Sequence, residues 1–241
     1  MFNWVPGGNV DHTAYDTHAE HFDLLVAGMW RALGPTLAAE LRGLDPHHGP
    51  AVDMGAGTGR GTELVARLNP DVEVLAVEPS PALRTAMFTR IGGDPDLARR
   101  VTVLPGTATG TPLPDRVCAV LLANAVAELN PVQRRELWRS VAGRLAPGAP
   151  LVVNVGVPGV QEENRVRIGA REYHNTGVVV PGEPGRVRWR ITTEVRAAGA
   201  VVQRLTADHV SWEVSLPQLC QELTEAGLRP RRTGVVVVAT R

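Results

Sequence analysis

The stretch Val52-Asp53-Met54-Gly55-Ala56-Gly57-Thr58-Gly59 decides the fold of this chain. It places three glycines at alternate positions directly after a short apolar run, and a helix-like pattern follows. Glycine lets a backbone turn tightly and approach a ligand closely. The stretch therefore predicts a strand, a tight turn and a helix, with a ligand lying against the turn.

The residues on both sides of this turn extend the alternation of strands and helices. We expect strands over 51–54, 72–77, 101–104, 117–123 and 151–155, and helices over 58–68, 81–91 and 131–145. A last helix over 217–226 precedes an extended stretch over 228–232 and a final strand over 235–240. Apolar strands that alternate with helices are typical of a parallel sheet covered on both faces. The predicted fold class is α/β, with a doubly wound seven-stranded sheet.

One domain is expected, because 241 residues with 44% hydrophobic side chains suit one core better than two. Its expected parts are N-terminal helices over 1–45, a core over 46–157, an insertion over 158–214 and a C-terminal helix with two strands over 215–241. The N-terminal segment is expected to form two helices that are interrupted at Gly34-Pro35. Within the insertion, apolar residues alternate over 187–195 and the chain returns over 201–214, which predicts an antiparallel hairpin.

The composition excludes several classes of function. Twenty-five basic residues balance 25 acidic ones, which disfavours a nucleic-acid partner. The absence of lysine excludes Schiff-base chemistry and a P-loop. Cys118 and Cys220 lie far apart, and the histidines lack metal-ligand spacing, so neither a disulfide framework nor a metal is expected. With no signal peptide or membrane span predicted, the chain is expected to be soluble and cytoplasmic.

The acidic residues around the turn bear on which ligand it holds. A dinucleotide fingerprint requires glycine at 55, 57 and 60, but position 60 is Arg60. Asp53 is unsuited to a neighbouring diphosphate, whereas it could meet a cationic amine. Glu78 follows the second strand, where a carboxylate can accept bonds from two hydroxyls, each worth roughly 1.5–3 kcal/mol. The pattern favours a ligand with hydroxyls and an amine over a nicotinamide dinucleotide.

The motif Asp-x-Gly-x-Gly-x-Gly that begins at Asp53 resembles motif I of class I S-adenosylmethionine-dependent methyltransferases. The resemblance covers about residues 15–155 and implies a Rossmann-like methyltransferase fold with N-terminal lid helices. It implies that Glu78 takes the ribose hydroxyls, that Asn124 lies against the methionine part and that Tyr15 closes over the cofactor. The cofactor-binding residues that it implies are Tyr15, Asp53, Gly55, Ala56, Gly57, Glu78, Pro79, Thr107, Ala108 and Asn124.

Two positions depart from the pattern of this family. Thr107 stands where an acidic residue is usual beside the adenine, so its contact is expected to be uncharged and weaker. Ala127-Glu128-Leu129 stands where small-molecule relatives often read His-His-Leu. Glu128 thus becomes a catalytic candidate, as a base or as an amine-orienting carboxylate, although a solvated acid at a helix start is an equal alternative. His21 is the second catalytic candidate, because it could reach the acceptor.

The resemblance implies transfer of a methyl group to an oxygen or nitrogen of a small molecule, in specialised metabolism such as natural product biosynthesis. The insertion is expected to choose the acceptor, and the chain to be a monomer or homodimer. Asn124-Ala125-Val126-Ala127 lacks the Asn-Pro-Pro-Tyr motif of nucleic-acid amino-methyltransferases and the acidic cluster of metal-dependent catechol enzymes. Two alternatives stay open, a non-catalytic S-adenosylmethionine-binding scaffold subunit and a protein methyltransferase.

Overall fold

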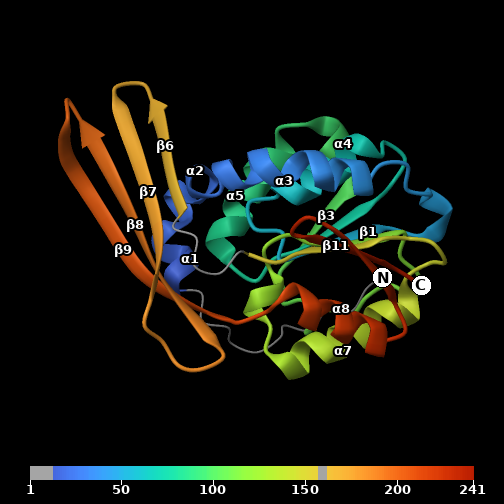
Figure 1. Ribbon diagram of the computed structural model, residues 1–241. Coiled ribbons are helices and arrows are strands. Elements are labelled where there is room, and N and C mark those ends of the chain that lie inside the picture. Colours follow the sequence, from blue (N-terminus) through green and yellow to red (C-terminus); the bar gives the residue numbers. More distant parts are fainter. Residues whose placement is uncertain (1–12, 157–161) are drawn as a thin grey trace. The chain divides into compact units, whose positions relative to one another are not determined.

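The main sheet of the computed structural model, which describes residues 13–156 and 162–241, has seven strands in the order β10-β11-β5-β4-β1-β2-β3 (Figure 1). Neighbours among β1 to β5 are parallel, while β11 is antiparallel to both β5 and β10. This order confirms the predicted α/β fold class. The strands are β1 (Ala51–Met54), β2 (Val74–Val77), β3 (Val101–Leu104), β4 (Ala119–Leu122), β5 (Leu151–Asn154), β10 (Arg229–Thr233) and β11 (Val236–Thr240).

Helices cover both faces of this sheet, with α4 and α5 on one face and α7 and α8 on the other (Figure 1). Side-chain caps and prolines in the first turn start three of them, because Ser80, Asn130 and Ser215 each accept bonds from the following backbone. The helices and short 3-10 turns of this part are α3 (Ala27–Glu40), η2 (Pro46–His48), α4 (Arg60–Leu68), α5 (Pro81–Gly92), α6 (Pro95–Arg100), η3 (Val126–Glu128), α7 (Pro131–Arg144) and α8 (Leu216–Glu225).

The N-terminal segment differs from the two helices predicted for it. It forms α1 (Thr13–His18), η1 (Ala19–His21) and α2 (Phe22–Leu25), and then α3, which continues through Gly34-Pro35 without the expected break. A proline inside a helix removes one hydrogen bond at a cost of about 3 kcal/mol. Leu37 and Leu41 lie one turn apart on α3 and its end, and both are fully buried. Their burial offsets the cost of Pro35.

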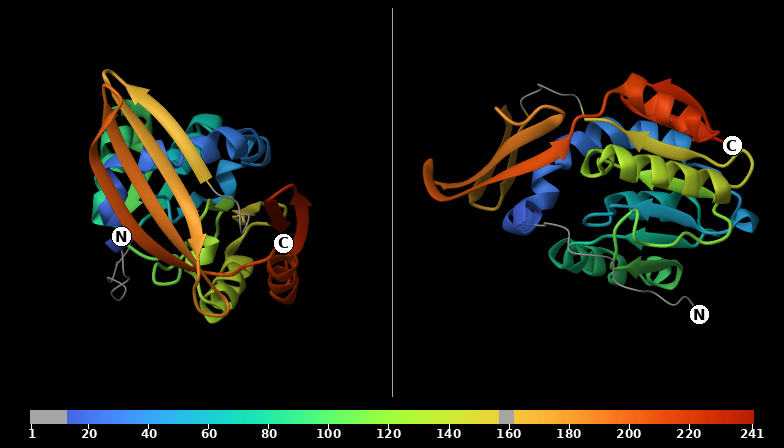
Figure 2. Two further views of the ribbon diagram at one scale, coloured as in Figure 1. Left: turned by 60° about the vertical axis from the view of Figure 1, so that its left-hand side comes forward. Right: turned by 90° about the horizontal axis from the view of Figure 1, so that it is seen from below.

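The insertion is larger than the predicted hairpin. It forms an antiparallel sheet in the order β6-β7-β8-β9, with β6 (Glu162–Ile168), β7 (Arg171–Val180), β8 (Arg186–Ala197) and β9 (Ala200–Trp212) (Figure 2). The prediction identified β8 and β9, whose alternation is long and regular. It missed β6 and β7, because glycines, prolines and polar side chains dominate their part of the sequence and hide the period of two.

Within the described residues, the contacts of the chain divide it into two compact units. Unit 1 contains residues 35–156 and 214–241, and unit 2 contains residues 13–34 and 162–213. Each unit is therefore made of two separate segments of sequence. A search of the described residues finds no helix with both the length and the apolar character needed to cross a bilayer.

Candidate functional site

The glycine turn follows β1 at the carboxyl edge of the main sheet. Gly55, Gly57 and Gly59 have φ angles of 72°, 58° and 85°, a region that favours glycine. The N–H groups of Gly55 and Ala56 donate to Val77 O at 2.9 and 3.0 Å, which ties the turn to β2. A Cβ added to Gly55 would lie 2.7 Å from the Cβ of Ala125, so the turn also packs closely against the residues after β4. At its three glycines the turn places no side chain of its own between the backbone and a ligand.

Glu78, at the end of β2, is joined directly to this turn. Its Oε2 accepts from Gly57 N and its Oε1 from Ser80 N, both at 2.8 Å, and the residue is 5% exposed. Each carboxylate oxygen has two acceptor positions, so each keeps one for a ligand hydroxyl. Burial raises the pKa of Glu78, and the two N–H groups oppose that shift. The nearby charge of Arg84 lowers this pKa, and the charge of Glu128 raises it.

Asp53 lies behind the turn and is 2% exposed. Thr62 Oγ1 donates to Asp53 Oδ2 at 2.7 Å, and a Cβ on Gly61 would lie 2.9 Å from the same oxygen. That oxygen therefore faces the first turn of α4. Burial raises the pKa of Asp53 to about 7, against the bond from Thr62 and with a contribution from the charge of Glu78. The expected contact of Asp53 with an amine stays a prediction.

Asn124 and Asn154 form a reciprocal pair at the ends of β4 and β5. The N–H of Asn124 donates to Asn154 Oδ1 at 2.8 Å, and Asn154 Nδ2 donates to Asn124 Oδ1. Asn124 has a φ of 57°, which is uncommon for a residue with a side chain but is best tolerated by asparagine and aspartate. Asn154 is 2% exposed. The pair fixes the backbone of Asn124 where the site meets β4.

The other predicted residues of unit 1 surround the same edge. Pro79 follows Glu78, and Glu78 N donates to Leu104 O at 3.1 Å, which brings the end of β3 beside it. Thr107, in the loop after β3, accepts at Oγ1 from Gly110 N at 2.9 Å, and Ala108 is its neighbour. Glu128 ends η3 and is exposed. The structure thus brings together the ends of four parallel strands, where ligands bind in open α/β sheets.

The two predicted residues near the N-terminus, Tyr15 and His21, belong to unit 2. The ring of Tyr15 lies 5.1 Å from that of His209 on β9, in an edge-on arrangement, and 5.8 Å from Phe22. The ring of His21 lies 5.4 Å from that of Tyr173 on β7. Within their unit both residues pack against the second sheet, and their roles toward cofactor and acceptor stay predictions.

Sequence reasoning missed the residues that support this edge from behind. Asn154, Thr62 and Ser80 each bond to a predicted site residue, yet none belongs to a motif that the sequence shows. Asn154 gave one usable signal, since it is a polar residue at the end of an otherwise apolar strand. Among the described residues, no group of three or more His, Cys, Asp or Glu side chains has an arrangement that could hold a metal ion.

Residues 51–148 match a family described as a methyltransferase domain, and this span contains the turn, Glu78, Asn124 and Glu128. The chain contains a class I S-adenosylmethionine-dependent methyltransferase domain. It is also 37% identical over 120 residues to a trans-aconitate 2-methyltransferase of Methylobacterium radiotolerans. That match covers 49% of this chain and 43% of the relative, so the chain spans less than half of the curated relative's length.

Solved structures of two methyltransferases resemble the whole chain. One is an S-adenosylmethionine-bound amino pentose methyltransferase of Micromonospora echinaspora involved in calicheamicin biosynthesis, with a TM-score of 0.71, 20% identity and coverage of 98% of this chain and 99% of that one. The other is a sugar N-methyltransferase of Streptoalloteichus sp ATCC 53650, with a TM-score of 0.63, 16% identity and coverage of 100% and 96%. At such identities the likeness is one of fold.

The residues of the methyltransferase domain fit S-adenosylmethionine, which is the cofactor of this domain. The three glycines of the turn place no side chain of their own between backbone and ligand, and Glu78 keeps acceptor positions for two hydroxyls. Glu78 and Glu128 give the site negative charge, which suits a ligand that carries a sulfonium and an ammonium group. The expectation of this cofactor is confirmed, while the individual contacts stay predictions.

Proposed function

We propose that this chain transfers a methyl group from S-adenosylmethionine to an oxygen or nitrogen of a small molecule in specialised metabolism. The observation that carries the proposal is the bond between Gly57 N and Glu78 Oε2, which joins the glycine turn to a buried carboxylate at the carboxyl edge of the sheet. The likeness of the whole fold to methyltransferases of an amino pentose and a sugar supports a small acceptor.

We assign the cofactor contacts as follows. Glu78 accepts the ribose hydroxyls, with Pro79 beside it, and the backbone of Gly55 to Gly57 lies against the methionine part together with Asn124. Thr107 and Ala108 border the adenine, and Asp53 supports the turn from behind through Thr62. When bound, S-adenosylmethionine supplies a methyl group on a positively charged sulfur. The residues of the chain then have to align the acceptor's electron pair with this methyl group and exclude water.

On the acceptor side, Glu128 is the candidate base. It would take up the proton that an attacking hydroxyl or protonated amine must lose. It is exposed, and its charge reaches Glu78, so it lies near the cofactor edge of unit 1. We assign Tyr15 to the cofactor, over which it is expected to close, and His21 to the acceptor. We also propose that methyl transfer needs no metal, that the chain acts in the cytoplasm and that it is a monomer or homodimer. Light scattering measures the last point.

Calorimetry with S-adenosylmethionine tests the assignment of Glu78. Glu78→Ala removes both acceptor oxygens, so we expect the affinity to fall at least about tenfold, which corresponds to about 1.4 kcal/mol. Glu73→Ala is the matched control, because Glu73 is an exposed acid just before β2 and should leave the affinity unchanged. Equal binding by both variants, or preferential binding of a nicotinamide dinucleotide by the unmodified chain, would show that the assignment is wrong.

Turnover separates the proposal from its alternatives. A scaffold subunit would bind S-adenosylmethionine without ever releasing its demethylated product, whatever acceptor is offered. A protein methyltransferase would release it only with polypeptide acceptors. We expect release with small acceptors, and the same rate with a metal chelator present. Loss of turnover with chelator and recovery with added magnesium would contradict the metal-free assignment.

A further inference from the structure

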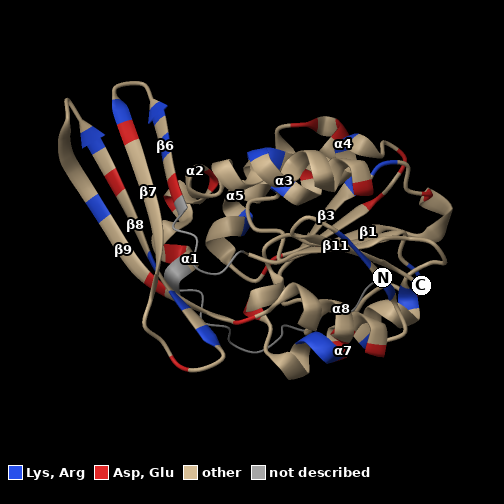
Figure 3. Cartoon of the chain, viewed as in Figure 1, with Lys and Arg blue, Asp and Glu red and all other residues tan. Residues whose placement is uncertain are grey.

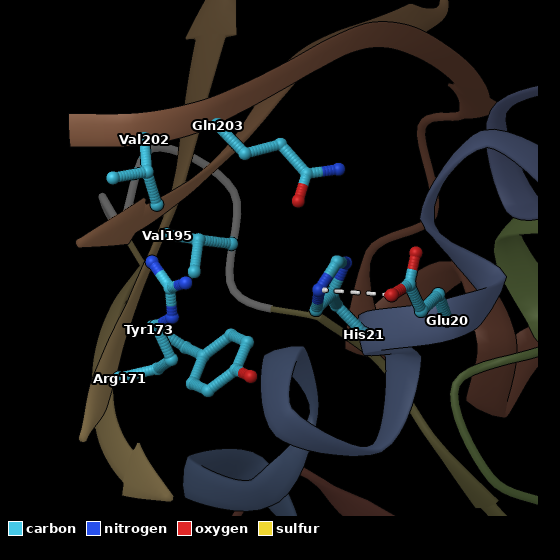
Figure 4. Close-up of a pocket in the computed structure, with 7 residues that line it drawn as sticks. All are labelled: Glu20, His21, Arg171, Tyr173, Val195, Val202 and Gln203. Carbon is cyan, nitrogen blue, oxygen red and sulfur yellow. Dashed lines mark ion pairs between the residues drawn. The ribbon is translucent and has the colours of Figure 1, made fainter. Parts of the chain in front are cut away.

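Unit 2 contains a pocket of about 390 Å³ on the inner face of its sheet, the face against which η1 packs. Figure 4 shows His21 and Glu20 on one side of the opening and Arg171, Tyr173 and Gln203 on the others. Val195 and Val202 complete it with apolar surface. All of these side chains belong to unit 2. The volume is in the range of small-molecule sites.

Arg171 is the charged group of this pocket that has no partner among the described residues. The outer face of the same sheet also carries arginines, and six of them form ion pairs with a glutamate or aspartate on that face, while Arg186 lies over the ring of Trp212. Figure 3 shows the basic and acidic positions along these strands. These paired residues are Arg165, Arg167, Arg188, Arg190, Arg196 and Arg204. Among the described residues, Arg171 has neither an ion pair nor a side-chain hydrogen bond. Its guanidinium is therefore free to bind an anionic group through two parallel bonds.

The pocket also presents a buried nitrogen atom that has no partner in the described part of the chain. His21 is 4% exposed, and its Nδ1 has no hydrogen-bond partner among the described residues, while its Nε2 lies 3.9 Å from a Glu20 oxygen. Buried polar atoms are normally hydrogen-bonded, so this nitrogen indicates a polar group of a ligand.

We propose that this pocket binds a small organic acid, with Arg171 as the counter-ion of its carboxylate or phosphate. Gln203, also exposed, can donate to the same anionic oxygens, and the ring of Tyr173 packs against the carbon skeleton of the acid. His21 accepts from or donates to a hydroxyl of the ligand. Glu20 is the acid among the described residues that line the pocket, and its side chain is 76% exposed, so water and salt screen its charge.

Calorimetry on the full chain, without methyl transfer, tests this proposal independently of the proposed function. The probes are citrate for carboxylates, glucose 1-phosphate for phosphates and glucose as the uncharged control. We expect one acid to bind, and Arg171→Gln to weaken its binding at least about tenfold. Arg171→Lys keeps the positive charge but not the two parallel N–H donors of the guanidinium, and should retain part of the affinity. Arg165→Gln, on the outer face, is the matched control and should bind as the unmodified chain does.

The outcomes decide the proposal and the source of the anion. Preference for citrate assigns a carboxylate ligand, and preference for glucose 1-phosphate assigns a phosphate ligand. The proposal is overturned if neither acid binds more tightly than glucose, or if Arg171→Gln and Arg165→Gln bind the acid equally well. Thermal unfolding of each variant shows that it is folded. Unchanged S-adenosylmethionine affinity in Arg171→Gln shows that unit 1 is intact.

Discussion

Asp53 is a buried acid whose pKa lies far above its ordinary value, at about 7 instead of 3.8. Between these values the folded chain holds a proton that the unfolded chain has released. The free energy of unfolding must therefore fall as the pH rises through this range. Asp53→Asn cannot ionise, and its Oδ1 can still accept from Thr62 Oγ1. We therefore expect the free energy of unfolding of Asp53→Asn to fall less over this pH range than that of the unmodified chain.

Denaturant unfolding of both proteins at several pH values between 3.8 and about 7 measures this difference. The pKa of Glu78 is also raised, but Glu78 is present in both proteins, so the difference between the two curves isolates Asp53. Parallel curves would mean that Asp53 is ionised in the folded chain. The amine contact expected from the sequence would then explain Asp53 better than a neutral structural role.

Asn124 allows a second prediction at the scale of one residue, because its φ of 57° separates two substitutions. Asn124→Gly removes the Cβ and adopts this angle freely, whereas Asn124→Ala keeps the Cβ without the polar side chain that lets asparagine tolerate the angle, a strain of about 1–2 kcal/mol. Both lose the bond from Asn154 Nδ2. We expect Asn124→Ala to be less stable than Asn124→Gly by about 1 kcal/mol in chemical unfolding. Equal stabilities would show that the backbone relaxes there.

The residues of the site divide into those that the sequence can show and those that it cannot. The glycine turn and Glu78 were predictable because their spacing is local and follows directly from a strand, a turn and the next strand. Asn154 and Thr62 were not, because their roles depend on which neighbouring strand or helix their side chains meet. Arg171 was equally hidden, since only the register of β7 shows that it lies on the inner face.

At the scale of elements, α7 and α8 are joined by a buried ion pair. Arg134 is 0% exposed and donates to Glu222 at 2.8 and 3.0 Å, and its third nitrogen donates to Leu129 O at 2.9 Å. Glu222→Gln leaves the buried guanidinium without a counter-charge, which should cost about 3 kcal/mol of stability in denaturant unfolding. Glu225→Gln is the control on the exposed side of α8 and should change stability by less than about 0.5 kcal/mol.

A double replacement tests whether charge or packing is responsible. Arg134→Met combined with Glu222→Leu removes both charges and keeps apolar volume, so it should be more stable than Glu222→Gln alone. A double variant as unstable as the single one would assign the loss to the bonds that the pair makes with Leu129 O and Trp138 Nε1. In both variants we expect the loop that carries Glu128, next to Leu129, to be less well positioned. The Km for the acceptor should therefore rise.

The elements themselves were largely predictable where their pattern is strong. The strands of the main sheet read as apolar runs, and α5, α7 and α8 begin at residues 81, 131 and 216, at or next to the predicted starts. The pattern failed at α3, because a local break signal at Pro35 is overridden by burial of Leu37 and Leu41. It failed again at β6 and β7, because polar side chains occur on both faces of these strands, as with His174 and Asn175, and leave no clear alternation.

At the scale of the whole chain, both units are discontinuous in sequence, which no local pattern reveals. The main apolar cluster of the core draws all its members from unit 1, among them Trp138, Leu122 and Val237. Unit 2 contributes its own sheet, with α1 and α2 packed against it. The insertion and the N-terminal helices are thus one structural part, although more than 120 residues separate them along the chain.

This division predicts that unit 1 folds and binds cofactor without unit 2. Residues 35–156 joined to 214–241 through a flexible linker keep the apolar cluster, the glycine turn and Glu78. We expect S-adenosylmethionine to bind within about tenfold of its affinity for the full chain. Methyl transfer should be lost, because Tyr15, which we assign to the cofactor, and the acceptor contacts that we assign to His21 and the insertion are gone. Transfer at the full rate would place acceptor recognition within unit 1, and would leave Glu128 as its main candidate.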